Sequence, residues 1–236
     1  MNVMSKDAYR AELARGLTEI LKLNIDIEMR KNAANCAIYK WTEADGKYEN
    51  NRYWSLRALE YYNRKGNRAY KLVHEHIVPR RIIKSELMNL TLYDLNFIKN
   101  NDIKTTKVYE ILNKYCIGAV ITKAEDLSMN AVMSNSKSLK SAMPLEYEDN
   151  TNTKYYKNVW ARYVKTNEVN SSDYSKTITI LDLNNHGAII DIGIKGHSEA
   201  VHKELTSLVE NNKKKLPFED VACMVVNGEF FTECIE

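Results

Sequence analysis

The sequence predicts an α+β fold, because helical and strand-like patterns occupy different parts of its 236 residues. Apolar residues at helical spacing dominate the N-terminal quarter, and short runs of β-forming residues appear in the middle and near the C-terminal end. We therefore expect a helical N-terminal region, a central region that contains strands, and a C-terminal β-rich unit with one helix.

Helices are expected wherever apolar residues recur every three or four positions. In the first of them, Leu13, Leu17 and Leu21 share one face, and Ser5 with Asp7 can cap the start. The expected helices cover residues 5–22, 25–42, 51–64, 80–87, 91–100, 105–115, 154–163 and 198–210, and one more begins after Thr122.

Strands are expected where β-forming residues alternate or form compact apolar runs. The stretch Ala69–Val78 alternates such residues and stops at Pro79, so we expect a strand that ends near His76. Cys116–Thr122 is an apolar run typical of a buried strand. Two hairpins are expected further on, from residues 177–181 with 188–194, and from residues 221–226 with 229–232 across an Asn-Gly turn.

The best candidate for a domain boundary is the polar stretch from Thr166 to Ser175, which has the composition of a linker. It divides the chain into a mainly helical domain, residues 1–165, and a C-terminal α/β unit, residues 176–236. The chain length also permits both parts to pack as one domain.

Composition is that of an ordinary globular protein, with 44% hydrophobic residues, 28% charged residues and a net charge of +3. No apolar run approaches the ~20 residues that cross a bilayer, and the N-terminus lacks the pattern of a secretion signal. We therefore expect a cytoplasmic protein with no membrane partner. The four cysteines, at positions 36, 116, 223 and 234, are widely spaced and are expected to be free thiols.

The residues best suited to chemistry are His74, Glu75 and His76, at the end of the strand before Pro79. Histidine can act as a base or a metal ligand near neutral pH. On a regular strand Glu75 faces away from both histidines, but a break before Pro79 can turn Glu75 and His76 toward a shared cleft. A carboxylate that holds a divalent ion beside an imidazole that activates water is typical of metal-assisted hydrolases.

The segment Glu75-His76-Ile77-Val78-Pro79 resembles the first motif of the HNH, or His-Me finger, endonucleases, in which an acidic residue and a histidine precede an aliphatic pair and a proline. The resemblance implies a ββα-like site region, with Glu75 as a metal ligand and His76 as the general base that deprotonates the attacking water. It also implies an asparagine that orients the base and a second ligand on the following helix. The zinc-binding cysteine pairs common in that family are missing.

The second metal ligand of the family is usually a histidine or an asparagine, but no histidine lies between His76 and His186. The ligand is therefore expected among three residues of the helix after the strand 116–122: Glu125, Asp126 and Asn130. We expect Mg²⁺ or Mn²⁺ as the ion. A less favoured alternative is a zinc site in which His197, His202 or a carboxylate completes a pair formed by His74 and His76.

Basic residues near the motif are candidates for contacts with nucleic-acid phosphates. They are Arg80, Arg81, Lys84 and Arg162. A solvated helix face explains the first three equally well, and core packing of Trp160 and Tyr163 is favoured over a nucleic-acid face around the fourth.

These observations favour a metal-dependent nuclease of the HNH-like kind that acts on DNA more than on RNA, in a setting such as restriction or phage defence. The alternative is a noncatalytic interaction or regulatory protein, a phage or host factor, that binds its partner through the C-terminal β-rich unit. Phe230 and Phe231 in that unit could also join two copies into a homodimer.

Overall fold

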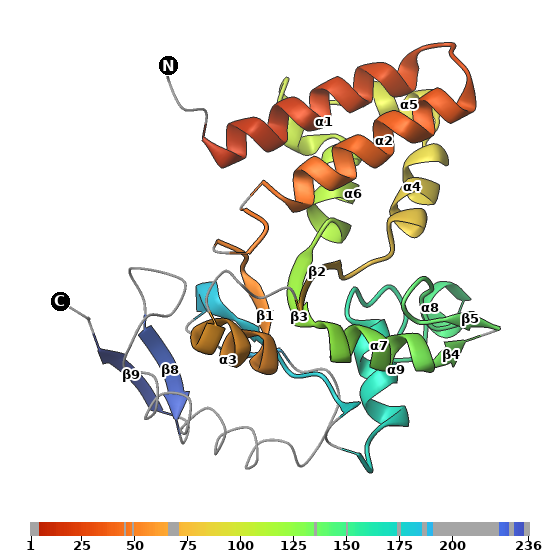
Figure 1. The fold of residues 1–236 in the computed structure, drawn as a ribbon. Coiled ribbons are helices and arrows are strands. Elements are labelled where there is room, and N and C mark those ends of the chain that lie inside the picture. Colours follow the sequence, from red (N-terminus) through yellow and green to blue (C-terminus); the bar gives the residue numbers. More distant parts are fainter. Residues whose placement is uncertain are drawn as a thin grey trace. The chain divides into compact units, whose positions relative to one another are not determined.

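The computed structural model describes residues 5–44, 46–48, 50–65, 71–134, 136–149, 151–173, 176–185, 188–190, 222–226 and 229–233. Its contacts divide the chain into two units that interleave along the sequence. The first unit comprises Met1–Lys47 and His76–Gly118, and the second comprises Tyr48–Glu75 and Ala119–Glu236. The expected α+β class is confirmed, because the first unit is helical and the second is built on a mixed sheet (Figure 1).

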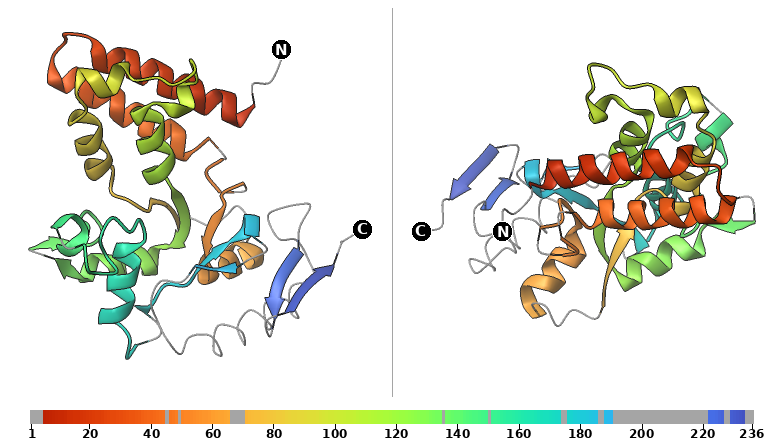
Figure 2. Two further views of the ribbon diagram at one scale, coloured as in Figure 1. Left: turned by 180° about the vertical axis from the view of Figure 1, so that it is seen from behind. Right: turned by 90° about the horizontal axis from the view of Figure 1, so that it is seen from above.

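The first unit is a small helical core. Its helices are α1 (Lys6–Lys22), α2 (Ile27–Thr42), α4 (Arg80–Met88), α5 (Leu92–Asn96), the 3-10 helix η2 (Ile103–Thr105) and α6 (Lys107–Tyr115). Helices α1 and α2 lie side by side in every view (Figure 2), and α4 and α6 pack against them. Ile38, Trp41 and Leu112 are buried in this core. As expected, the side chain of Ser5 caps α1 by accepting a hydrogen bond from the backbone of Ala8.

Helix α5 is shorter than the sequence pattern over 91–100 predicts. It ends at Asn96, because Phe97 is extended and both Asn100 and Asn101 adopt left-handed backbone conformations, with φ of 54° and 57°. Asparagine tolerates this region better than most residues, so the two consecutive asparagines form a turn in place of another helical turn.

The second unit contains the main sheet, whose strand order is β2-β3-β1-β6-β7. The strands are β1 (Tyr53–Ser55), β2 (Leu72–His76), β3 (Gly118–Thr122), β6 (Ile180–Asp182) and β7 (Ala188–Ile189). Strand β1 pairs in parallel with β3 and antiparallel with β6. The first residue of β3 and the last residue of β2 belong to the helical unit, so both strands carry the chain from one unit to the other.

Strands β2 and β3 run antiparallel, as two backbone hydrogen bonds at their ends show. Ile77 donates to Ile117 (2.9 Å), and Lys123 donates to Lys71 (2.7 Å). Moving along one segment from 71 to 77 therefore corresponds to moving back along the other from 123 to 117, which is the antiparallel relation. Helix α7 (Lys123–Ala131) follows β3 directly, so this part of the chain has a strand, strand, helix order in space.

The remaining elements of the second unit are short. They are α3 (Leu56–Lys65), β4 (Met133–Ser134), β5 (Lys137–Ser138), α8 (Glu146–Asp149), α9 (Ala161–Val169), the 3-10 helix η4 (Leu183–Asn185), β8 (Ala222–Val226) and β9 (Glu229–Glu233). The two expected hairpins are confirmed where they are described, since β6 pairs antiparallel with β7 and β8 with β9. The expected helix over 198–210 lies outside the described residues.

The expected helix over residues 51–64 is wrong at its start, where Tyr53–Ser55 form β1 and only the following residues are helical. Trp54 explains the difference, because its fully buried side chain packs in the core that the sheet forms with α3. Its backbone pairs with Val120 on one side and Leu181 on the other. Tertiary pairing of this central strand outweighs the local helical pattern.

The predicted linker over 166–175 is also wrong at its start, because α9 continues through Val169. Thr166 and Asn167 are buried, and the side chain of Asn167 both donates to the carbonyl of Ile178 (2.8 Å) and accepts from its amide (2.7 Å). Asn167, a polar residue of this stretch, thus binds buried backbone groups. No helix in the described part of the chain is long and apolar enough to cross a membrane.

Candidate active site

The start of helix α7 is fixed by a reciprocal cap that uses one of the predicted metal ligands. Thr122 accepts a hydrogen bond from the amide of Glu125 (3.2 Å), and the Glu125 carboxylate accepts from the Thr122 amide (2.8 Å). The same carboxylate oxygen accepts from the hydroxyls of Thr122 (2.9 Å) and Ser55 (2.6 Å). Burial raises the pKa of Glu125, although these donors act in the opposite direction. Glu125 therefore anchors α7 to β1 through one carboxylate oxygen, Oε2.

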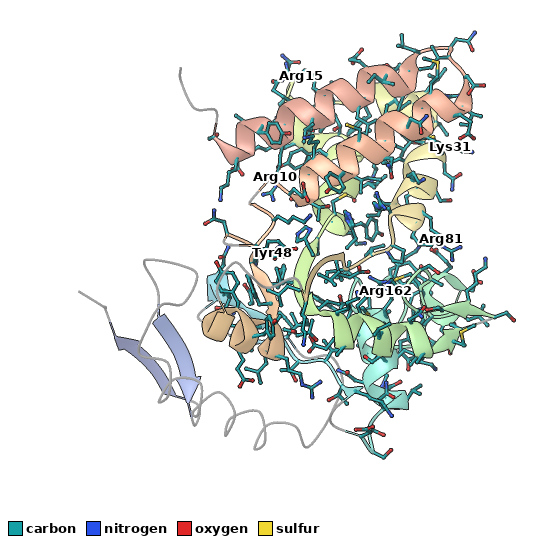
Figure 3. All side chains as sticks on the ribbon, viewed as in Figure 1. Arg10, Arg15, Lys31, Tyr48, Arg81 and Arg162 are labelled. Carbon is teal, nitrogen blue, oxygen red and sulfur yellow. The ribbon has the colours of Figure 1, made fainter. Side chains whose placement is uncertain are left out.

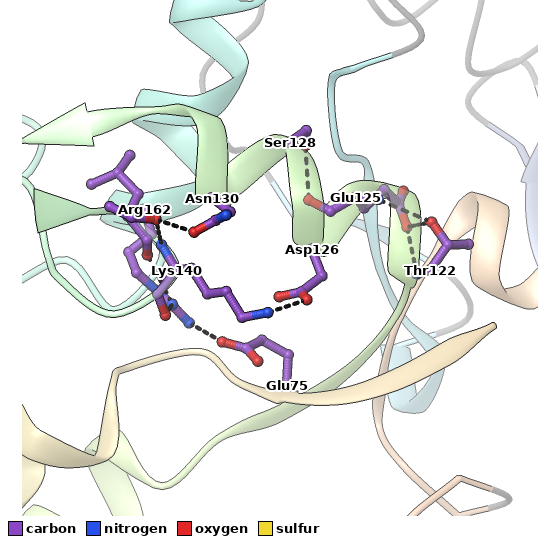
Figure 4. Close-up of polar contacts among 10 residues, drawn as sticks. Glu75, Thr122, Glu125, Asp126, Ser128, Asn130, Lys140 and Arg162 are labelled. Carbon is purple, nitrogen blue, oxygen red and sulfur yellow. Dashed lines mark hydrogen bonds and ion pairs between the residues drawn. The ribbon is translucent and has the colours of Figure 1, made fainter. Parts of the chain in front are cut away.

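Glu75 projects from β2 toward Arg162 on α9 (Figure 4). The Arg162 guanidinium donates to the Glu75 carboxylate (2.9 Å), and it also donates to the carbonyls of Leu139 (3.0 Å) and Lys140 (2.8 Å). The side chains of Arg162 and Glu75 are 0% and 16% exposed. Burial raises the pKa of Glu75, and this effect exceeds the opposite effect of Arg162. The negative charge of Asp126 raises it further.

Asp126 lies on the first turn of α7, and its side chain is only 6% exposed. One carboxylate oxygen, Oδ2, accepts a hydrogen bond from the ammonium of Lys140 (2.5 Å). The other, Oδ1, is buried and has no hydrogen-bond partner among the described residues. A buried carboxylate oxygen without a partner is costly, so this oxygen points to a role beyond packing.

Tyr163, like Asp126, has a buried polar atom without a hydrogen-bond partner in the described part of the chain. Its side chain is fully buried on α9, and burial raises the pKa of its hydroxyl. The charge of Arg162 lowers that pKa, and the charges of Glu75, Glu125 and Asp126 raise it. The Tyr163 phenol and the Oδ1 atom of Asp126 are thus both buried without a hydrogen-bond partner among the described residues.

Asn130 lies one helical turn after Asp126, so both side chains belong to the same face of α7. Its carbonyl oxygen accepts a hydrogen bond from the hydroxyl of Ser138 on β5 (2.9 Å). The structure therefore brings Glu75 and Asp126 together and leaves Asn130 at the edge of the group (Figure 4). We call Glu75, Asp126, Lys140, Arg162 and Tyr163 the carboxylate cluster.

His76 is the last residue of β2, and its imidazole Nδ1 lies 3.2 Å from the hydroxyl oxygen of Thr42 on α2. The Thr42 hydroxyl donates its single proton to the carbonyl of Ile38 (2.8 Å), so toward the histidine it can only accept. With the Thr42 proton on the carbonyl of Ile38, a neutral His76 would carry its ring proton on Nδ1 and its lone pair on Nε2. This tautomer suits a base that acts through Nε2.

The strand continues through His76, and no break turns its side chain to the side of Glu75. The described hydrogen bonds of the two side chains lie on different elements, with Thr42 for His76 and Arg162 for Glu75. Alternation along β2 accounts for this, because successive side chains of a strand leave it on opposite faces.

The predicted nucleic-acid contacts fall into two groups. Arg80 and Arg81 are exposed on the first turn of α4, and Lys84 is half-buried one turn later (Figure 3 labels Arg81 and Arg162). Arg162 is fully buried and binds protein groups only in the part of the chain described here. Its predicted phosphate contact is therefore corrected to an internal role, in which it holds Glu75 and the backbone that precedes α8.

Among the described residues, no group of three or more histidine, cysteine or acidic side chains is arranged to hold a metal ion. His197 and His202, which the alternative zinc site requires, lie outside them, as do the side chains of Phe230 and Phe231. Cys36 and Cys116 are free thiols, as predicted.

Sequence reasoning missed two residues that the structure adds to the predicted set, Lys140 and Thr42. Lys140 lies in a polar stretch that carried no motif, and Thr42 is the last residue of a helix far from His76 in the sequence. No sequence signal marks either contact, because each depends on how distant segments pack.

Comparisons with family models, with curated proteins and with solved structures found no match to this chain.

Proposed function

We propose that this protein is a divalent-metal-dependent phosphodiesterase that cleaves DNA, with β2, β3 and α7 in the role of the ββα unit of the HNH endonucleases. The sequence of Glu75-His76-Ile77-Val78-Pro79 supports this, and so does the antiparallel pairing of β2 with β3 followed directly by α7. In that family the acidic residue and the histidine come from the first strand and the second ligand comes from the helix.

The observation that carries the proposal is the unpartnered Oδ1 of Asp126, whose side chain lies near that of Glu75 (Figure 4). Carboxylate oxygens are the ligands that Mg²⁺ and Mn²⁺ prefer, and Mg²⁺ is often held by only one or two carboxylates together with substrate phosphates and water. Glu75 and Asp126 fit such a site, and the unpartnered phenol of Tyr163 offers a hydrogen bond to bound water. Asn130 can add an amide oxygen from the same face of α7.

In this proposal each residue of the chain has a separate task. The motif assigns His76 the removal of a proton from the attacking water through Nε2. Because its side chain leaves β2 on the face opposite Glu75, this step requires the imidazole to turn toward the ion. Thr42 favours the tautomer that leaves Nε2 unprotonated. Arg162 orients Glu75, and the Glu125 cap fixes the first turn of α7 so that Asp126 keeps its position. A bound divalent ion would supply charge stabilisation for the phosphodiester and its leaving group.

The proposal is tested by incubating the purified chain with supercoiled plasmid, duplex and single-stranded DNA in Mg²⁺ or Mn²⁺, with EDTA as the metal-free control. We expect cleavage by the wild type and a loss of about 10²–10⁴-fold in the rate for His76→Ala, which removes a general base. Glu75→Gln and Asp126→Asn should lose cleavage as well.

Glu110→Gln is the matched control, since Glu110 is exposed on α6 and pairs only locally with Lys107 in the described structure. It should cut at the wild-type rate. Equal cleavage by wild type, His76→Ala and Asp126→Asn would assign the activity to a contaminant and overturn the proposal. Absence of cleavage by the wild type with every metal and substrate would also count against it.

A further inference from the structure

Lys140 is the member of the carboxylate cluster whose contact is easiest to exchange. Its ammonium binds Oδ2 of Asp126, yet its side chain is 45% exposed while that of Asp126 is 6% exposed. A long flexible side chain of this kind reaches from solvent into a buried carboxylate. The ammonium end can therefore leave Asp126 for water without opening the core.

The backbone of Lys140, in contrast, is firmly placed. Its carbonyl accepts a hydrogen bond from Arg162 (2.8 Å), and its amide donates to the hydroxyl of Ser138 (3.1 Å). Arg162 also holds Glu75, so one buried guanidinium fixes both the backbone that carries the ammonium and the second carboxylate of the cluster. The ammonium can change its partner while its point of attachment stays beside the acids.

We infer that Lys140 is an exchangeable counter-ion: it neutralises Asp126 in the metal-free protein, and it binds a phosphate of the DNA once a divalent cation holds Asp126. This inference rests on the proposed function. A divalent cation and an ammonium cannot share one carboxylate without strong repulsion, so the two compete for Asp126. The displaced ammonium then lies next to a cation site that binds a phosphodiester, so it forms an ion pair with a phosphate of the DNA.

The unpartnered phenol of Tyr163 is an independent sign that the cluster is built to receive a ligand. It belongs to a different element from the acids, is fully buried, and has no hydrogen-bond partner among the residues described. Water held by a cation between Glu75 and Asp126 would give the phenol an acceptor.

The exchange predicts two effects of opposite sign for Lys140→Gln. Binding of Mn²⁺ should become tighter by about fivefold, because the competing cation is gone, and fivefold corresponds to about 1 kcal/mol, the upper range for a partly exposed ion pair. Binding of duplex DNA should become weaker, and the slope of log affinity against log salt should fall by about 0.9, the value for one lost phosphate contact.

The experiment measures Mn²⁺ binding from the electron paramagnetic resonance signal of free Mn²⁺, with Asp126→Asn as the variant that should lose the site. DNA binding is measured by fluorescence anisotropy with a duplex oligonucleotide, in a His76→Ala background that keeps the DNA intact. Lys137→Gln is the matched control, since Lys137 is an exposed lysine on β5, and it should leave Mn²⁺ binding unchanged.

A purely structural lysine would weaken Mn²⁺ binding or leave it unchanged when replaced, and either result overturns the inference. Tighter Mn²⁺ binding with an unchanged salt slope for DNA overturns the phosphate-binding half. If the wild type binds no Mn²⁺ at all, the proposed function itself fails, so the two failures can be told apart. Thermal unfolding of Lys140→Gln in EDTA confirms that the variant is folded.

Discussion

Replacement of Arg162 by methionine is the sharpest test of the carboxylate cluster as a folded unit. Methionine fills a similar volume but removes the guanidinium that binds Glu75 and the carbonyls of Leu139 and Lys140. Removing one partner of a buried ion pair costs roughly 3–5 kcal/mol, because the remaining charge has no compensation. Glu75 is 16% exposed, so the lower end of that range applies to its carboxylate.

The two carbonyls that lose their donor add about 1 kcal/mol each. The expected loss in the free energy of unfolding is therefore about 5 kcal/mol at pH 7, a large part of the stability of an ordinary domain. Arg162→Lys provides a milder variant in case the methionine variant does not fold. Lysine keeps the charge but cannot serve three separate acceptors, and we expect a loss of about 2 kcal/mol.

The assay is urea denaturation followed by far-ultraviolet circular dichroism, with a double variant to isolate the ion pair. Glu75→Gln combined with Arg162→Met removes the uncompensated charge, and it should recover about 2 kcal/mol relative to Arg162→Met alone. No recovery in the double variant, or a loss below about 1 kcal/mol for Arg162→Met, would refute the view that this arginine compensates a buried carboxylate.

The same variants make a prediction about pH. Without the guanidinium, the pKa of Glu75 rises further above its ordinary value, because the counter-ion that lowered it is gone. A carboxyl whose pKa is raised by folding contributes stability that is fully present below its unfolded pKa and is lost as pH rises through its folded pKa. The penalty of Arg162→Met should therefore shrink when the urea titrations are repeated toward pH 4. A penalty that does not change with pH would contradict this.

Three further outcomes follow from contacts described above. Thr42→Val should shift the tautomer of His76 away from the form protonated on Nδ1, which the ¹⁵N chemical shifts of the imidazole measure. It should also lower the rate of DNA cleavage by roughly tenfold. An unchanged tautomer would rule out that Thr42 sets the protonation of His76. Asn167→Ala should lower the free energy of unfolding by about 3 kcal/mol, because it leaves the buried amide and carbonyl of Ile178 without partners, and a loss within experimental error in urea denaturation would contradict that. Glu125→Gln should remove a pH dependence of the free energy of unfolding. Burial raises the pKa of Glu125, so the stability of the wild type falls relative to that of the variant as pH rises from about 4.3 through the raised pKa. Parallel curves of stability against pH for the two proteins would show that Glu125 does not titrate in this range.

Local patterns predicted those parts of the fold that depend on neighbouring residues. Ser5 before an amphipathic run gave the start of α1, and Thr122 before Glu125 gave the cap of α7. The Asn-Gly pair between two β-forming runs predicted the hairpin that β8 and β9 form. In each case the deciding interaction spans only a few residues of sequence.

The predictions that failed concern residues whose contacts lie far away in the sequence. Trp54 lies in a helical pattern, yet pairing with β3 and β6 makes it part of a strand. Arg162 looked like a surface residue because arginine is rarely fully buried, and its three acceptors come from distant segments that no periodicity identifies. Asp126 and Lys140 are 14 residues apart, with β4 and β5 between them, so no local periodicity identifies their contact.

The interleaved course of the chain has a consequence for how the protein is made. Helices α1 and α2 are synthesised before β1, α3 and β2, but their packing partners α4 and α6 are synthesised only after these elements. Strand β3, which pairs with β2, is synthesised later still, after α6. Each unit therefore needs segments that are translated after part of the other unit. The core of the helical unit therefore cannot be completed until the chain has been synthesised through α6, and the apolar faces of α1 and α2 lack these packing partners until then.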